Sequence, residues 1–424
     1  MPDYKRKKTH TVRRRRAKSD APKPQVNIVP RRRKKPIKED ITQDSSMRVI
    51  RGRKGEKRKK FYALSGIAAA LVLTIVILSI IAPVSLFESV QDFTKSIGSG
   101  SLPADISGNE VVDCVPKSNY YYVLSDTSLM AYTNGGKKIY SFVHGFSSPV
   151  LVTSQTRALL FDQGKNSAVI YNLAGVVKTI NTKNNIIAAD ITKDGEYALV
   201  TKSDAYANTV SVFNRKGKSL YSINLAKDLV NHVDLSSSGK KIALATINSE
   251  SGKIAFGVRI YDFNSADPIF KLDLGQDTVY DIENTGRGFF VTTHNKSRYI
   301  KWSDYTTTEY DFEGDIASLR YSNSGFMAVY NKTNDKSNST AVLFSNRGKK
   351  ISEFDIKGII NDIRFSRGRV YTMGDNKIAI YDKYGELLRS GSCSFGGVRI
   401  AVTGSNTVCV INDSQIEETA VKKG

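Results

Sequence analysis

One short pattern recurs along most of this 424-residue chain: a strand-like run ends in an aromatic residue, and glycine follows four positions later. Seven aromatic residues, spaced 37 to 48 residues apart, mark the copies: Tyr132, Tyr171, Phe213, Tyr261, Trp302, Phe344 and Tyr381. Five copies have the glycine, at Gly136, Gly175, Gly217, Gly348 and Gly385. Because glycine supplies the positive φ of a tight hairpin, the pattern predicts the end of one strand and the turn into the next.

Each period contains four strand-like segments, which in the third period are "NIIAADIT", "EYALVTK", "NTVSVFN" and "KSLYSINL". Four short strands per repeat of about 40 residues are typical of a β-propeller blade. Complete units are predicted at 109–146, 147–184, 185–228, 229–277, 278–315, 316–358 and 359–395. The remaining C-terminal residues supply three strands, and "LPADISG" (102–108) can supply the fourth. The fold class is therefore all-β, an eight-bladed propeller, with seven blades as the alternative.

The segment before the repeats has a different composition. Residues 1–60 contain 24 of the 63 Lys and Arg, only 6 of the 41 Asp and Glu, and one aromatic residue, Tyr4. This composition predicts a disordered basic cytoplasmic tail. Residues 61–87 carry no charge, and 12 of residues 61–82 are Ile, Leu, Val or Phe. Since 22 helical residues span about 33 Å, residues 61–84 are predicted to be an uncleaved transmembrane helix.

The charge distribution predicts the topology. Basic residues before the span place the N-terminus in the cytoplasm and residues 102–424 outside the membrane. The tail is expected to contact anionic lipid, and without interleaved aromatic residues or a folded reader it predicts no specific nucleic-acid binding. Residues 85–101 are predicted to form a juxtamembrane helix and linker. Leu86, Val90, Phe93 and Ile97 would lie on one stripe of a short interfacial helix.

The sequence contains no recognisable catalytic, cofactor or metal motif. The histidines (His10, His144, His232 and His294) lie in different segments without metal-ligand spacing. No G-x-S-x-G elbow, phosphate-binding loop or dinucleotide fingerprint occurs. The three cysteines (Cys114, Cys393 and Cys409) form no disulfide framework. Cys114 and Cys409 fall in adjacent blades, where free thiols are the expected state and a disulfide is the alternative.

Acidic residues recur in the predicted first strands. Asp190, Asp234 and Asp281 each precede a glycine by five residues, and Asp113 and Asp362 occupy near-equivalent positions. First strands line the central channel of a propeller, so these carboxylates could form a ring that holds a cation or a basic ligand. The alternative interpretation is that each carboxylate accepts hydrogen bonds from local turn amides in a repeated structural role.

Three connections between second and third strands are lengthened: 202–209, 248–257 and 331–340. Strand directions alternate, so these loops are predicted to emerge on one face together with the connections between blades. Repeat proteins tend to carry insertions on their binding face. The candidate binding residues in these loops are Asp204, Tyr206, Glu250, Lys253, Asn334 and Asp335.

The four-stranded unit with its "YDKYG" turn at 381–385 resembles WD40-like and PQQ-like propellers. The basic tail, single span and eight-unit ectodomain together resemble a family of single-pass envelope proteins from Gram-positive bacteria. PQQ-binding repeats carry a recurrent tryptophan, whereas Trp302 is the only tryptophan here, so no cofactor is predicted.

The resemblance transfers no catalytic motif. The leading hypothesis is therefore a membrane-anchored, non-enzymatic propeller that binds or scaffolds an extracytoplasmic envelope protein, peptide or glycan. One alternative is a propeller enzyme, similar to a glycosidase or lyase, that uses the channel carboxylates. Another is a transmembrane sensor.

Overall fold

The computed structural model describes residues 84–422 except 251, 335 and 395, together with residues 62, 65, 66, 69, 70 and 74. The side chains of residues 84–87 and 250 also lie outside the described part. The predicted basic tail (1–60) and most of the predicted span (61–84) fall outside it as well. Within the described residues, no helix combines the length and apolar character that crossing a bilayer requires.

Residues 104–420 form eight antiparallel sheets of four strands, and each sheet is one blade. Blade 1 contains β2 (Val111–Pro116), β3 (Tyr120–Ser125), β4 (Ser128–Thr133) and β5 (Lys138–Val143); blade 2 contains β6 (Pro149–Thr153), β7 (Ala158–Asp162), β8 (Ser167–Asn172) and β9 (Gly175–Asn181). Blade 3 contains β10 (Ile186–Ile191), β11 (Tyr197–Thr201), β12 (Asn208–Phe213) and β13 (Ser219–Leu225); blade 4 contains β14 (Leu229–Leu235), β15 (Lys241–Glu250), β16 (Lys253–Asp262) and β17 (Phe270–Gly275).

The second half of the ring repeats this order. Blade 5 contains β18 (Val279–Asn284), β19 (Gly288–Thr293), β20 (Lys296–Lys301) and β21 (Thr307–Asp311); blade 6 contains β22 (Asp315–Ser322), β23 (Gly325–Asn331), β24 (Asn338–Phe344) and β25 (Lys350–Lys357). Blade 7 contains β26 (Asp362–Ser366), β27 (Arg369–Gly374), β28 (Lys377–Asp382) and β29 (Leu387–Ser392); blade 8 contains β30 (Arg399–Val402), β31 (Thr407–Ile411), β32 (Gln415–Ala420) and β1 (Ala104–Asp105).

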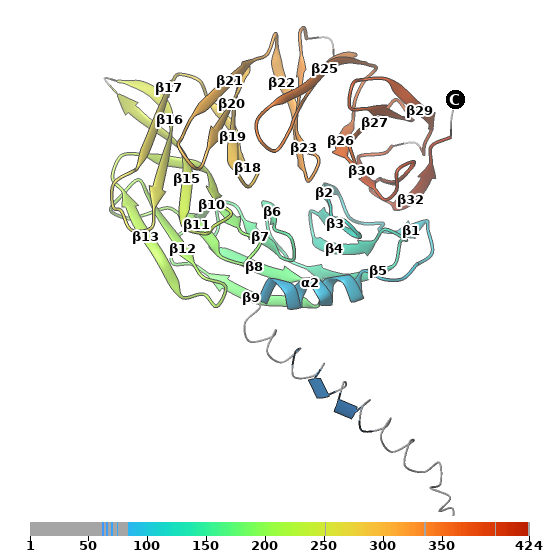
Figure 1. The fold of residues 1–424 in the computed structure, drawn as a ribbon, viewed down its shortest axis with the longest axis horizontal. Coiled ribbons are helices and arrows are strands. Elements are labelled where there is room, and N and C mark those ends of the chain that lie inside the picture. The colour runs from blue at the N-terminus through green and yellow to red at the C-terminus, as the bar shows by residue number, and fades with distance from the viewer. Residues whose placement is uncertain are drawn as a thin grey trace, which may run out of the picture. The chain divides into compact units, whose positions relative to one another are not determined.

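The two ends of the repeat region close the ring. Strand β1 pairs with β32 through Ala104 opposite Ile416 and Asp105 opposite Gln415, so the last blade takes its fourth strand from residues before the first blade. Figure 1 shows the blades following one another in chain order, with red β30 and β32 beside cyan β2 and β1. The prediction of eight four-stranded blades is confirmed, and the seven-bladed alternative is wrong.

The hydrophobic core lies between the blades. Eight clusters of buried apolar side chains occur in the described residues, one at each contact between neighbouring blades, including the closing contact of blades 8 and 1. A single blade has two apolar faces and cannot bury both alone, so the ring is stabilised as a whole. Cys114 and Cys409 belong to the closing cluster, and both are free thiols, as is Cys393.

The recurring glycine has the conformation that the sequence predicts. All five repeat glycines have positive φ, from 76° at Gly348 to 131° at Gly175. A side chain would also collide with a neighbour at some of these turns, because a Cβ atom added to Gly385 would lie 2.4 Å from Cγ of Phe354. The repeat is therefore fixed by backbone conformation and by packing between blades.

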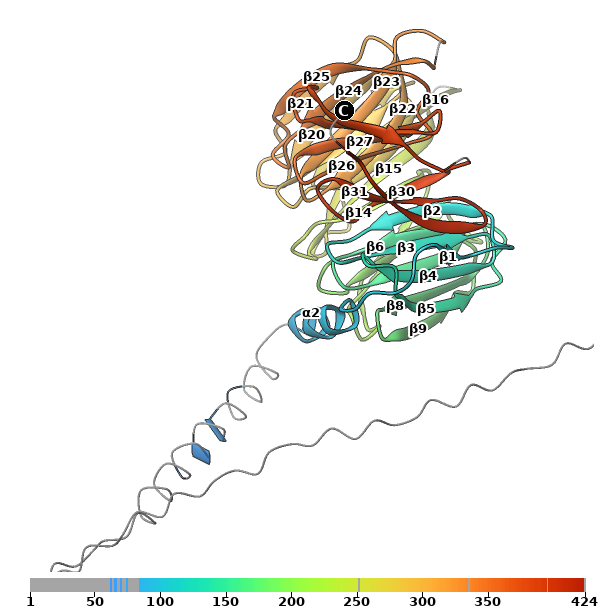
Figure 2. The same cartoon turned by 90° about the vertical axis from the view of Figure 1, so that its right-hand side faces the viewer.

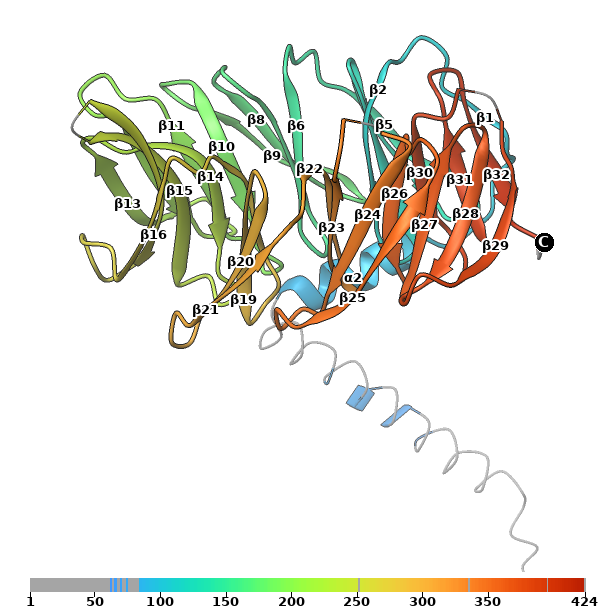
Figure 3. The same ribbon diagram turned by 90° about the horizontal axis from the view of Figure 1, so that it is seen from above.

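Helix α2 (Val84–Lys95) precedes the ring and packs on one of its two faces. Glu88 of α2 meets the β6–β7 and β12–β13 turns, through Arg157 and Arg215. Figures 1 and 2 show α2 beside β8 and β9, and Figure 3 shows it at one end of the strands. We call this the helix face. Because strand directions alternate, the connections between second and third strands emerge on the opposite side, which we call the loop face.

Candidate functional site: charged side chains around the channel and on the two faces

Charged side chains collect on the first strands, which form the inner edge of each sheet. In every blade, one backbone amide closes the hairpin between the first and second strands. We define the inner-ring position as the residue that lies two places before the residue carrying this amide. In blades 3 to 7 the closing amides belong to Thr192, Ser236, Thr285, Ser322 and Ser366. The inner-ring residues of these blades are therefore Asp190, Asp234, Glu283, Arg320 and Arg364.

Inner-ring side chains hold neighbouring blades together. Asp190 Oδ2 accepts a hydrogen bond of 2.7 Å from the Leu235 amide of the next blade. Arg320 Nε donates across the next contact to the Ile363 carbonyl at 2.9 Å. The inner strand is a sheet edge, whose amides and carbonyls lack partners within the sheet. Carboxylates and guanidinium groups from the preceding blade therefore satisfy this edge.

Blades 3 to 5 bring three of the predicted carboxylates into one group with Glu283. Burial raises the pKa of Asp190 to about 6 and that of Asp281 to about 7. Burial, and then the charges of Asp190, Glu283 and Asp281, raise the pKa of Asp234 well above its ordinary value. Burial and the charges of Asp281 and Asp190 do the same for Glu283, which Lys117 opposes. The group therefore carries fewer than four negative charges near pH 7.

Burial is the main reason why the pKa of Asp234 is raised. Its side chain is only 5% exposed, and Oδ1 has no hydrogen-bond partner among the described residues. Among all the residues that the structure describes, no group of three His, Cys, Asp or Glu side chains is arranged to hold a metal ion.

The other two predicted carboxylates lie elsewhere and are paired with arginines. Asp362 is fully buried, with Arg320 at 2.8 Å and Arg364 at 2.9 Å, and it accepts a hydrogen bond from the Ile400 amide of the next blade. Asp113 Oδ1 lies 3.9 Å from Nε of Arg399. The five predicted carboxylates thus do not form one ring: three join an acidic arc in blades 3 to 5, and two lie beside arginines.

Sequence reasoning missed Glu283 because it counted back from the glycine of each turn. The closing turn of blade 3 runs from Thr192 to Glu196, whereas that of blade 5 runs only from Thr285 to Gly288. In the shorter turn the glycine comes two places earlier, so counting back five residues reaches Asp281 instead of Glu283. Counting from the end of the strand would have identified the equivalent position.

On the loop face, two of the predicted loops are connections of six residues each, longer than the two-residue β3–β4 and β19–β20 connections. The 202–209 segment contains six residues between β11 and β12, where Asp204 pairs with Lys183 at 3.0 Å and Tyr206 is exposed. In 331–340, six residues connect β23 to β24; Asn334 is exposed, and Asp335 lies outside the described residues.

The third predicted loop, 248–257, is not a loop. Strands β15 and β16 continue through it as a paired hairpin up to Glu250 opposite Lys253, which leaves two residues in the turn. Ile254, near the tip, is 60% exposed, and Lys253 is exposed beside it. Ile254 and Phe256 of "KIAFG" have high strand propensity, and the correct interpretation is that the insertion lengthens the sheet.

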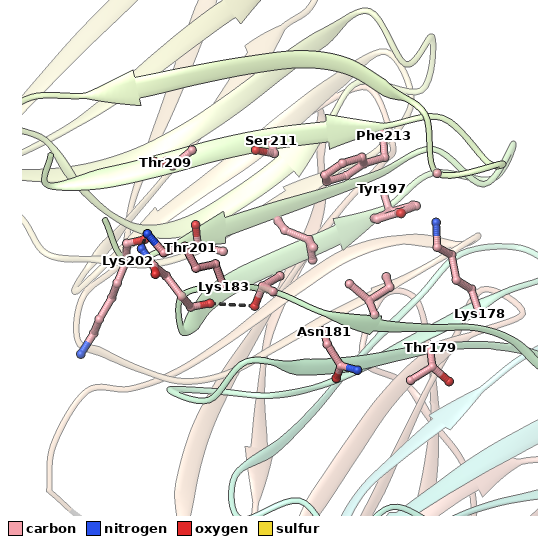
Figure 4. Close-up of a pocket in the computed structure, with 15 residues that line it drawn as sticks. Lys178, Thr179, Asn181, Lys183, Tyr197, Thr201, Lys202, Thr209, Ser211 and Phe213 are labelled. Atoms are coloured by element: carbon pink, nitrogen blue, oxygen red, sulfur yellow. Dashed lines mark hydrogen bonds between the residues drawn. The ribbon is translucent and has the colours of Figure 1, made fainter. Parts of the chain in front are cut away.

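A groove of about 530 Å³ lies between blades 2 and 3. Figure 4 shows its lining, with Lys178 from β9, Lys183 and Lys202 from two connections, and aromatic side chains from blade 3. Tyr197 and Phe213 stack at 5.0 Å, and Nζ of Lys178 lies 5.6 Å from the centroid of the Tyr197 ring. Lys183 and Lys202 line the end nearest the loop face. The groove therefore combines positive charge with an aromatic wall.

Comparison with known proteins supports the fold. The propeller is similar to Sqt1 of Saccharomyces cerevisiae, with 10% identity and a TM-score of 0.52 over 77% of this chain and 100% of Sqt1. It is similar to the C-terminal WD40 domain of Sif2, with 13% identity and a TM-score of 0.51 over 77% and 99%. BamB from Moraxella catarrhalis aligns with 9% identity and a TM-score of 0.46 over 74% and 99%.

No curated protein matches the sequence. Residues 104–420 match the model of a family of unknown function, DUF5711.

Proposed function

The chain belongs to the DUF5711 family, and we propose that it is a membrane-anchored, non-catalytic propeller that binds a protein, peptide or glycan of the cell envelope through its loop face. The fold is of the WD40 type, a type commonly used as a protein-interaction scaffold. The proposed anchor is the uncharged, largely apolar segment 61–87, which is long enough to span a bilayer as a helix. The preceding basic tail favours a cytoplasmic N-terminus and an extracytoplasmic propeller.

The observation that carries the proposal is the position of α2. The chain enters the propeller on the helix face, where the two guanidinium groups of Arg157 and Arg215 lie 2.8 and 2.5 Å from Oε1 of Glu88. An anchor immediately before α2 would keep the helix face towards the membrane. The β15–β16 hairpin and the connections at 202–207 and 332–337 would then point away from the bilayer, where an envelope partner can reach them.

We propose no catalysis because carboxylates of the first strands already have a structural role. Asp190 and Asp362 each accept an amide hydrogen bond from the next blade. Glycosidases need two carboxyl groups that flank a substrate bond. The acidic arc has four neighbouring carboxyls with raised pKa values, and no described observation separates one acid from one base.

The groove between blades 2 and 3 indicates the charge of the partner. Three lysines line it beside the Tyr197–Phe213 stack: Lys178, Lys183 and Lys202. The end of the groove nearest the loop face lies next to the β11–β12 connection. Positive charge on a partly apolar wall favours an acidic peptide or an acidic glycan. We therefore propose that the partner is anionic where it contacts blade 3.

Site-specific photocrosslinking in intact cells tests the binding face. A photoreactive amino acid replaces Tyr206 on the loop face or, as the matched control, Tyr384 in the β28–β29 turn on the helix face; both tyrosines are exposed. We expect one defined envelope component to crosslink at position 206 and not at position 384, and this crosslink to weaken in the Lys178→Glu variant. Equal crosslinking at both positions, or at neither, would remove the loop face as the binding site.

The topology is tested separately. External protease is added to intact cells that carry a tag at each end of the chain. We expect the C-terminal tag to be lost and the N-terminal tag to be protected. Protection of both tags would overturn the extracytoplasmic location.

A further inference from the structure

The amphipathic helix α2 is oriented opposite to a typical surface helix. Its buried side is polar: Glu88 and Asp92 are each 6% exposed. Its outer side is apolar, because Val90 and Phe93 are 63% and 57% exposed, and Ile97, just beyond the helix, is 56% exposed. A surface helix of a soluble protein normally buries its apolar stripe and exposes its polar one.

The spacing of the residues along α2 places the buried side chains in one row and the exposed side chains in another. Glu88, Asp92 and Ser96 follow one another at intervals of four residues and are all buried. Val90, Phe93 and Ile97 follow at intervals of three and four residues and are all exposed. Side chains at such intervals stand on the same side of a helix. The exposed residues therefore form one apolar stripe.

The buried polar side has a specific reason to face the propeller. Arg157 donates to both carboxylate oxygens of Glu88, at 2.8 to 3.2 Å, and Thr156 donates to Oε2 at 3.1 Å. Arg215 completes the contact at 2.5 Å. Charge-assisted, bidentate hydrogen bonds of this kind fix orientation as well as position. The apolar stripe is consequently held away from the propeller core.

The chain itself indicates what covers this stripe. Helix α2 begins at Val84, directly after the uncharged run that starts at residue 61. A short helix that continues from a membrane span, with apolar side chains on one side, lies in the plane of the membrane interface. Lys95 in the last turn and Lys137, whose side chain is next to Gly98, are both exposed at the other end of the helix region. Such cations are attracted to lipid headgroups.

We propose that α2 is an interfacial helix that seats the propeller on the bilayer, with Val90, Phe93 and Ile97 at the boundary between headgroups and acyl chains and Glu88 fixed to the propeller. The occupant of the apolar stripe is lipid. The helix face then lies against the membrane, and the loop face is directed outward. This inference rests on the proposed membrane anchor and adds a second, oriented contact to it.

Tryptophan fluorescence in the full-length protein, reconstituted into vesicles with bromine-labelled acyl chains, tests the inference. Trp302 is the only natural tryptophan, and it is buried against Phe289 at 4.6 Å, so its signal is a constant background. Phe93→Trp adds a reporter on the stripe. Ile254→Trp is the matched control, because Ile254 is similarly exposed but lies on the loop face.

We expect Phe93→Trp to be quenched at least twofold more than Ile254→Trp, with a blue-shifted emission, and Val90→Trp to repeat the result in case residue 93 disturbs docking. Equal quenching at 93 and 254, while the protein still floats with the vesicles and resists alkaline extraction, would overturn the interfacial helix and leave the anchor standing. A blue shift without quenching would mean that a second copy covers the stripe, and this too would overturn the proposal. Failure to float would overturn the anchor and the inference together.

Discussion

Replacing Glu88 with glutamine tests how α2 is held on the propeller. Glu88→Gln keeps the shape of the side chain but removes the charge that Arg157 and Arg215 share. Breaking a buried ion pair by removing one partner costs about 3–5 kcal/mol, because the remaining charge stays unpaired. Two arginines would remain here, and they would repel each other.

This loss need not reduce the free energy of unfolding of the propeller. The helix can leave the helix face and expose both guanidinium groups to water, so the loss is limited to the free energy of docking. We expect docking to weaken by about 3 kcal/mol, which corresponds to a factor of roughly 100. The eight inter-blade clusters do not involve α2 in the described residues, so the melting temperature of the propeller should change little.

Hydrogen–deuterium exchange followed by mass spectrometry measures the effect. Peptides that cover residues 84–95 should exchange about 100-fold faster in Glu88→Gln, while peptides from β3 and β7 should keep their protection. Glu313→Gln is the matched control, because its pair with Lys332 at 3.0 Å is largely exposed and contributes little. Unchanged exchange of α2 in Glu88→Gln would refute the idea that these ion pairs hold the helix.

Further predictions concern pH and the buried charges. Burial raises the pKa of Asp92 from 3.8 to about 7, although the Leu173 amide opposes this, so the docked helix retains a proton that the free helix loses; docking should weaken as pH rises from about 4 to 7, and Asp92→Asn should slow α2 exchange at pH 8 but not at pH 4.5. Asp362→Asn leaves two arginines without their shared carboxylate and should lower propeller stability by about 3–5 kcal/mol in chemical denaturation. Asp234→Asn replaces a carboxyl with a strongly raised pKa, so stability at pH 7 should change by less than about 1 kcal/mol, and a loss as large as that of Asp362→Asn would contradict the protonated state. In the native protein at pH 8, a thiol reagent should modify the half-buried Cys393 before the two buried cysteines, which mass spectrometry of tryptic peptides can establish.

The repeat could be predicted because each blade obeys local rules. Glycine at a position with positive φ, short strands and a period of about 40 residues are all properties of neighbouring residues in the chain. The shortage of one strand at the C-terminus also predicts β1, since the last blade needs a fourth strand and the residues before the first blade can supply it. The prediction of a loop at 248–257 was wrong because it gave no weight to the strand propensity of Ile254 and Phe256, which lie in the β15–β16 hairpin.

The candidate site was less predictable, because equivalent positions in different blades depend on turn length. Asp281 and Glu283 are only two residues apart in β18, yet only Glu283 occupies the inner-ring position. The pairing of Asp362 with Arg320 joins residues from adjacent blades, which no local pattern specifies.

The amino-acid sequence by itself determined the number of blades, the closing strand and the amphipathic character of residues 84–97, because these follow from periodicity and turn chemistry. Only the tertiary structure decided which side of α2 faces the propeller. Ordinary hydrophobic patterning would bury Val90 and Phe93, but the ring brings Arg157 and Arg215, 58 residues apart in the chain, to one place on the helix face. Their combined charge makes burial of Glu88 favourable and turns the apolar stripe outward.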